Sequence, residues 1–169
     1  MDAQTLEQAY YLGELISVIA VVISLIYVGI GVRQNTLAVK SSTLQAIAEN
    51  QLEVHSILAS NGDLANIVFS GATGTGSNDG VEKFRFTSWM HMAMRSMENA
   101  YFQYHEGTLD QRNWNALCRQ YLPILHSGFN KTYWKERGFM FSEDFKNFID
   151  KELMSTSMPE GWSVPGSQS

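Results

Sequence analysis

The hydrophobic pattern of the chain begins with one uninterrupted apolar run. Leu15 to Val32 reads LISVIAVVISLIYVGIGV, 18 residues without a charged side chain. A helix rises 1.5 Å per residue, so this run covers about 27 Å, close to the hydrocarbon thickness of a bilayer. Inside lipid, every backbone N–H and C=O must be bonded within its own segment. The run therefore predicts a transmembrane helix over residues 15–32.

The flanks of the run favour an anchor over a cleaved signal peptide. The 14 residues before it contain no Lys or Arg, and the run ends in Val32-Arg33-Gln34-Asn35 without a small-residue cleavage site. Tyr10 and Tyr11 lie where interfacial aromatic residues are common. A buried core helix of a soluble protein is the alternative, although such helices more often have apolar runs of 10–14 residues.

Basic residues near the ends of the run predict its orientation. Arg33 and Lys40 follow the run, whereas no basic residue precedes it. The excess of Lys and Arg on cytoplasmic flanks therefore places residues 1–14 outside the cell and the later residues in the cytoplasm. The lone Cys118 agrees with this, since it has no second cysteine to pair with in the chain.

Helical periodicity continues beyond the apolar run. Residues 34–59 contain no Pro or Gly and repeat their apolar positions at helical spacing. We therefore expect one long helix from about Thr5 to Ser60. Asn61-Gly62 should end it, with Gly62 in the left-handed conformation.

The remaining pattern predicts shorter helices and no strands, because no segment alternates apolar and polar residues. The chain is thus expected to be all-α, with one transmembrane helix continuing into a cytoplasmic helical bundle over 33–154 and a loose tail over 155–169. The expected helices are 64–69 with Asp63 as cap, 79–106 closed by Gly107, one opening at Asp110 that Pro123 kinks or ends, 130–137 stopped by Gly138, and a last one capped by Ser142.

A glycine-rich segment, GATGTGSNDG at residues 71–80, is expected to be a flexible linker. A phosphate-binding loop would need Gly-Lys-Ser/Thr after the glycines and an apolar strand before them, and neither is present.

The charge balance excludes a nucleic-acid-binding domain. All 12 basic residues and 14 of the 17 acidic ones follow the apolar run, which leaves the rest of the chain at a formal charge of about −2. No polybasic patch follows the run either, so specific recognition of anionic lipid is not expected. The expected partners are the bilayer itself and another copy of the chain or another membrane protein.

Candidate chemistry lies on the predicted helix 79–106. His91, Glu98 and His105 recur every seven residues at the edge of its apolar arc. They could form a ligand pocket, or Glu98 could be a buried hydrogen-bond acceptor with both histidines at the margin of the core. A shared metal ion is not expected, because residues seven apart on a helix are about 10 Å apart. No cofactor and no catalytic residue are predicted.

Small residues form a stripe along the apolar run at steps of 4, 3, 4 and 7 residues. Such residues let membrane helices approach closely, so the stripe predicts a face for helix association. Its members are Gly13, Ser17, Ala20, Ser24 and Gly31.

Three short motifs resemble a group of small bacterial single-pass membrane proteins of unknown function. They are Tyr27–Asn35 (YVGIGVRQN) followed by Thr36, Glu98–Tyr104 (ENAYFQY) ending at Gly107, and Trp134 through Gly138 to Phe145. The resemblance covers most of residues 15–153. It implies a bacterial inner-membrane location and no established activity.

Two functions are consistent with these features. One is a non-enzymatic scaffold, assembly or regulatory subunit that acts through helix association. The other is a membrane-tethered enzyme or ligand sensor with a pocket around Glu98, His91 and His105.

Overall fold

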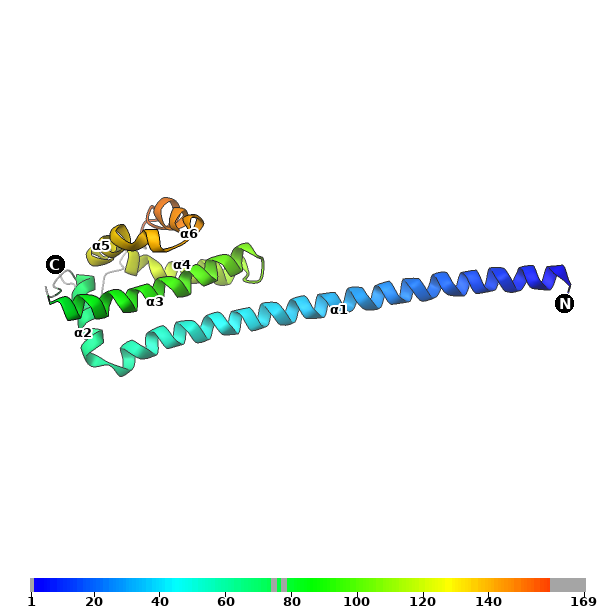
Figure 1. Ribbon diagram of the computed structural model, residues 1–169, viewed down its shortest axis with the longest axis horizontal. Helices are drawn as coiled ribbons and strands as arrows, with labels where there is room; N and C mark the ends of the chain where they lie inside the picture. Colours follow the sequence, from blue (N-terminus) through cyan, green and yellow to red (C-terminus); the bar gives the residue numbers. More distant parts are fainter. Residues whose placement is uncertain (1, 74–75, 77–78, 159–169) are drawn as a thin grey trace. The chain divides into compact units, whose positions relative to one another are not determined.

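The structure, a computed structural model, describes residues 2–73, 76 and 79–158, and this part of the chain contains helices and no strand (Figure 1). The all-α prediction is therefore confirmed. The elements are α1 (Ala3–Ser60), α2 (Gly62–Thr73), α3 (Gly80–His105), α4 (Gln111–His126), α5 (Gly128–Arg137), the 3-10 turn η1 (Gly138–Met140), α6 (Glu143–Phe148) and the π-helical turn η2 (Ile149–Leu153).

The chain divides into two units between Ser42 and Thr43. The first unit consists of α1 up to that point, and its large apolar side chains from Leu6 to Val32 expose between 48% and 78% of their surface. By length and composition this helix is long and apolar enough to cross a membrane. A helix with apolar side chains all round normally lies in a protein core or in lipid, and here the unit itself supplies no core.

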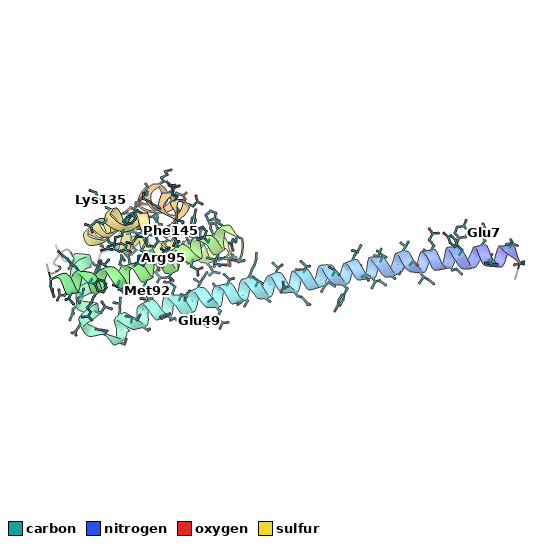
Figure 2. The ribbon with its side chains drawn as sticks, viewed as in Figure 1. Glu7, Glu49, Met92, Arg95, Lys135 and Phe145 are labelled. Carbon is teal, nitrogen blue, oxygen red and sulfur yellow. The ribbon has the colours of Figure 1, made fainter. Side chains whose placement is uncertain are left out.

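The second unit is a helical bundle built around α3. Within it α3 packs against α2 and α4, and α5 packs against α2 and α4 (Figure 1). The last turns of α1 contribute Ile47 and Val54 to the core, and the indole N–H of Trp89 donates to the Val54 carbonyl at 3.3 Å. Phe145 of α6 is fully buried (Figure 2). The apolar arc predicted for α3 faces this core, with Phe86, Trp89, Met90, Met94, Met97 and Tyr101 buried.

Close packing of α2 on α3 depends on Gly71. A Cβ atom at this position would lie 2.8 Å from the Cε2 atom of the Phe86 ring. Real Cβ atoms essentially never approach so closely, so a larger residue would displace the ring from the core.

The helix ends agree with the sequence in most places. Gly107 has φ +74°, as a left-handed C-terminal cap requires, and the Asp110 carboxylate accepts from the first N–H groups of α4. Gly62 was predicted to be left-handed, and this is wrong because it forms the first turn of α2. Asp63 is predicted to cap the helix that follows, and this is also wrong: Asp63 lies in the first turn of α2, and the Asn61 side chain is the cap, accepting from the Leu64 N–H at 3.0 Å.

Two further boundaries differ from the prediction. Of the two outcomes predicted for Pro123, a kink or an end of the helix, the end does not occur: the helix continues to His126, because Leu122 and Leu125 are buried on either side of the proline. Helix α2 extends to Thr73 and shortens the predicted linker, of which residues 74–75 and 77–78 lie outside the described residues. Of the predicted loose tail, residues 159–169 also lie outside them.

Candidate functional site

Glu98 is a buried carboxylate in the C-terminal half of α3, only 6% exposed. Its Oε2 atom accepts a hydrogen bond from the Arg95 guanidinium, and its Oε1 atom accepts from the backbone N–H of Ser142 at 2.7 Å. Both oxygens are therefore bonded to donors of the protein. Sequence spacing alone does not reveal the second donor, since Ser142 lies 44 residues away along the chain.

Arg95 extends this arrangement to the turn before α6. Its second terminal nitrogen donates to the Met140 carbonyl at 2.8 Å, and its guanidinium lies 4.8 Å from the centroid of the Phe141 ring. Together Glu98, Arg95 and the backbone groups of Met140 and Ser142 form what we name the Glu98 clasp. It holds the 140–142 segment against α3.

His91 lies one heptad earlier on α3 and has different neighbours. Its Nδ1 atom is 3.1 Å from the hydroxyl of Tyr133, and its ring centroid is 5.2 Å from that of Phe141. Burial, and next the positive charges of Arg95 and Arg137, lower the pKa of His91. Burial raises the pKa of Tyr133 to about 12, so the phenol keeps its proton. The pair is thus a neutral hydrogen bond.

His105 lies at the exposed end of α3, with its ring centroid 4.3 Å from that of Tyr101. The three candidate residues thus have different direct partners: Tyr133 for His91, the clasp for Glu98, and the Tyr101 ring for His105. His91 and Arg95 of the clasp share contact with the Phe141 ring. Within the described ranges no group of three or more His, Cys, Asp or Glu side chains is placed to hold a metal ion.

A polar contact that sequence analysis missed joins α1 to the bundle. The side-chain amide of Gln51 donates to the Ser96 hydroxyl at 3.0 Å and to the Tyr121 hydroxyl at 3.2 Å. The Tyr121 hydroxyl in turn donates to the Ala93 carbonyl at 2.8 Å. Gln51 lies in the same helical phase as the buried Ile47 and Val54, and that phase was the available sequence signal.

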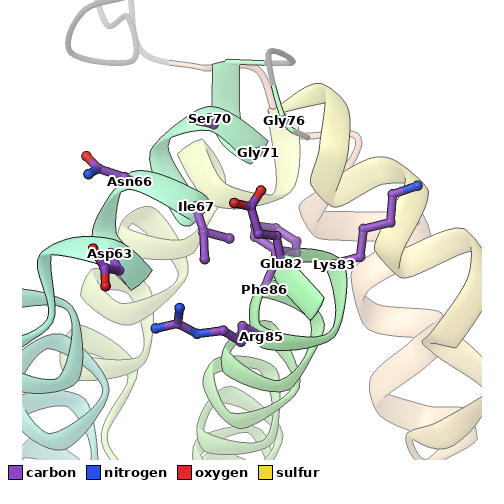
Figure 3. A pocket seen from close by; sticks show the side chains of 10 residues that line it. All are labelled: Asp63, Asn66, Ile67, Ser70, Gly71, Gly76, Glu82, Lys83, Arg85 and Phe86. Carbon is purple, nitrogen blue, oxygen red and sulfur yellow. The ribbon is translucent and has the colours of Figure 1, made fainter. Parts of the chain in front are cut away.

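An open cavity of about 480 Å³ lies between α2 and α3 (Figure 3). Its lining includes side chains of both charges, among them Asp63, Glu82 and Arg85, and the Arg85 guanidinium is 3.4 Å from the Asn61 side-chain oxygen. Because the charges are mixed, the cavity favours neither an anion nor a cation.

The predicted association stripe lies on the first unit. Gly13, Ser17, Ala20, Ser24 and Gly31 are all exposed. A Cβ built on Gly13 or Gly31 meets no atom within 4 Å, so nothing in the described chain covers the stripe there. The Ser17 hydroxyl donates to the Gly13 carbonyl at 2.8 Å, which satisfies this polar group within the helix.

Comparison with known proteins gives no relative: no family model, curated protein or solved structure matches the chain.

The clasp predicts unequal effects of two substitutions at Glu98. Glu98→Ala leaves the Ser142 N–H and one of the two bonded terminal nitrogens of Arg95 without an acceptor, so we expect a loss of about 1–3 kcal/mol in the free energy of unfolding. Glu98→Gln keeps an acceptor oxygen and should lose less. Urea unfolding of the full chain in mild detergent measures both, with the exposed Glu136→Ala as control. An alanine variant as stable as the wild type would contradict a structural role.

His91 predicts a pH dependence of stability. Its pKa is lower in the folded chain than the ordinary value of 6.5, so the unfolded chain binds more protons around that pH. The stability that the neutral imidazole contributes is complete above about pH 6.5 and is lost as the pH falls below it. We expect the difference in unfolding free energy between wild type and His91→Gln to shrink from about pH 7 to about pH 5. A constant difference would contradict this.

Proposed function

We propose that the protein is a single-pass membrane protein that serves as a scaffold, assembly or regulatory subunit through helix association, and that it does not catalyse a reaction. The observation that supports this proposal most strongly is the first unit, which is a helix with apolar side chains on every face and no packing partner in the described chain. Such a helix buries its apolar surface in lipid or against other helices.

The proposed location is a bacterial inner membrane, for which the support is the resemblance of the three motifs. The proposed orientation has residues 1–14 outside and the bundle in the cytoplasm, because Arg33 and Lys40 follow the apolar run.

The small-residue stripe supports association as the role of the membrane helix. Lipid chains are as apolar as Leu or Val, so membrane helices gain no hydrophobic energy from pairing and depend on close backbone packing. Glycine and serine at Gly13, Ser17, Ser24 and Gly31 leave that space open.

The bundle is proposed to bind or position proteins rather than substrates. The alternative, an enzyme or ligand sensor around Glu98, His91 and His105, would require these residues to exchange their protein partners for a ligand. Both Glu98 oxygens already accept hydrogen bonds, and the His91 imidazole is bonded to Tyr133. This arrangement favours the non-enzymatic proposal.

The stripe predicts which substitutions weaken association. Ser24→Leu and Gly31→Leu place bulk on the small-residue face and should reduce the crosslinked oligomer or the captured partner in native membranes. Val22→Leu adds one methylene on the opposite face and serves as the matched control. If all three variants crosslink like the wild type, the stripe has no part in association.

A further inference from the structure

A second periodic pattern runs along α1 and extends beyond the apolar run. Every seventh residue from Ile16 to Leu44 is aliphatic: Ile16, Ile23, Ile30, Leu37 and Leu44. The first three lie within the run, where most residues are apolar in any case. Leu37 and Leu44 follow Arg33 and are 59% and 41% exposed, so the membrane does not explain them.

The positions between these residues complete a heptad repeat. A second set of residues lies three positions before each aliphatic residue, and its members are small or uncharged. They are Gly13, Ala20, Tyr27, Gln34 and Ser41. No charged side chain occupies either set. Positions that alternate at steps of three and four residues lie along the seam of a left-handed coiled coil. After Arg33 the apolar members of this seam are Leu37 and Leu44, and the other members, Gln34 and Ser41, are polar.

We propose that α1 pairs in parallel and in register with α1 of a second copy of this chain, through this heptad seam. The proposal rests on the proposed function, because insertion in one membrane is what gives both copies the same direction and depth. Leu37 of each copy then faces Leu37 of the other in the segment after Arg33. In an antiparallel pair, these two segments would lie on opposite sides of the membrane, and both leucines would remain in water.

The residues beside the seam fit a parallel pair. In a parallel coiled coil, the residue directly before each member of the second set (such as Gln34 or Ser41) faces the residue five positions later in the partner helix. Arg33 therefore faces Ala38, and Lys40 faces Gln45, so no two like charges meet. Gln34 within the seam supplies a polar contact of the kind that fixes register.

The seam and the small-residue stripe describe one face. Gly13 and Ala20 belong to both, while Ser17, Ser24 and Gly31 directly follow the aliphatic positions and flank the seam. Small flanking residues allow the two backbones to approach. The repeat stops after Leu44, because the next position, Gln51, is hydrogen-bonded to Ser96 and Tyr121.

Cysteine crosslinking in native membranes tests the pairing. In a Cys118→Ala background of the full chain, single cysteines replace Leu37, Ser41 and Leu44 on the seam, and Val39 and Ser42 away from it. All five native residues are exposed. Mild oxidation should crosslink the three seam positions several-fold more than the other two.

A matched pair of substitutions provides a second readout. Leu37→Gln should reduce the dimer fraction of the full chain in mild detergent, measured by light scattering, whereas Val39→Gln on the far face should not. Equal crosslinking at all five positions, strongest crosslinking at 39 or 42, or no crosslinking overturns the pairing.

Alkaline carbonate extraction distinguishes a wrong pairing proposal from a wrong proposed function. If the chain stays in the membrane pellet without the seam pattern, the second-copy proposal is wrong and the membrane proposal stands. If carbonate releases the chain, both are overturned.

Discussion

The need to satisfy backbone hydrogen bonds away from water is the constraint on which this structure depends. An uncharged run of 18 residues can meet it alone only as a helix, and the helix that forms does not stop where the run stops. No Pro or Gly interrupts residues 34–59, so α1 continues to Ser60 and its last turns become part of the bundle core. One helix therefore carries two kinds of surface, apolar on all faces before Arg33 and with a few buried side chains, such as Ile47 and Val54, after Thr43.

Polar contacts fix how the helices of the bundle align with one another. Ile47 and Val54 supply apolar contact, but apolar contacts alone tolerate a shift of one turn, whereas Gln51 must meet Ser96 and Tyr121 to remain satisfied. The Glu98 clasp does the same for the turn before α6, since a buried carboxylate without donors is costly. These contacts account for the acidic and amide groups in the core without assigning them a reaction.

Local signals predicted the helices well, and long-range contacts explain where they failed. The left-handed Gly107 and the Asp110 cap follow from neighbouring residues and were predicted correctly. Pro123 lies inside a helix because Leu122 and Leu125 are buried, which the local rule does not consider. At the candidate site, the sequence identified Glu98 as the acidic group in an apolar stretch. Its partner Ser142 and the hydrogen bonds of Gln51 depend on how distant segments pack, so they were not predictable.

The side on which each end of the chain lies tests the central claim that α1 crosses a membrane. Single cysteines in place of the exposed Gln4 and Ser157, in a Cys118→Ala background, report the two ends in intact cells. An impermeant thiol reagent added outside is predicted to label position 4 and to reach position 157 only after lysis. Labelling of both positions before lysis, or of neither, would contradict the account.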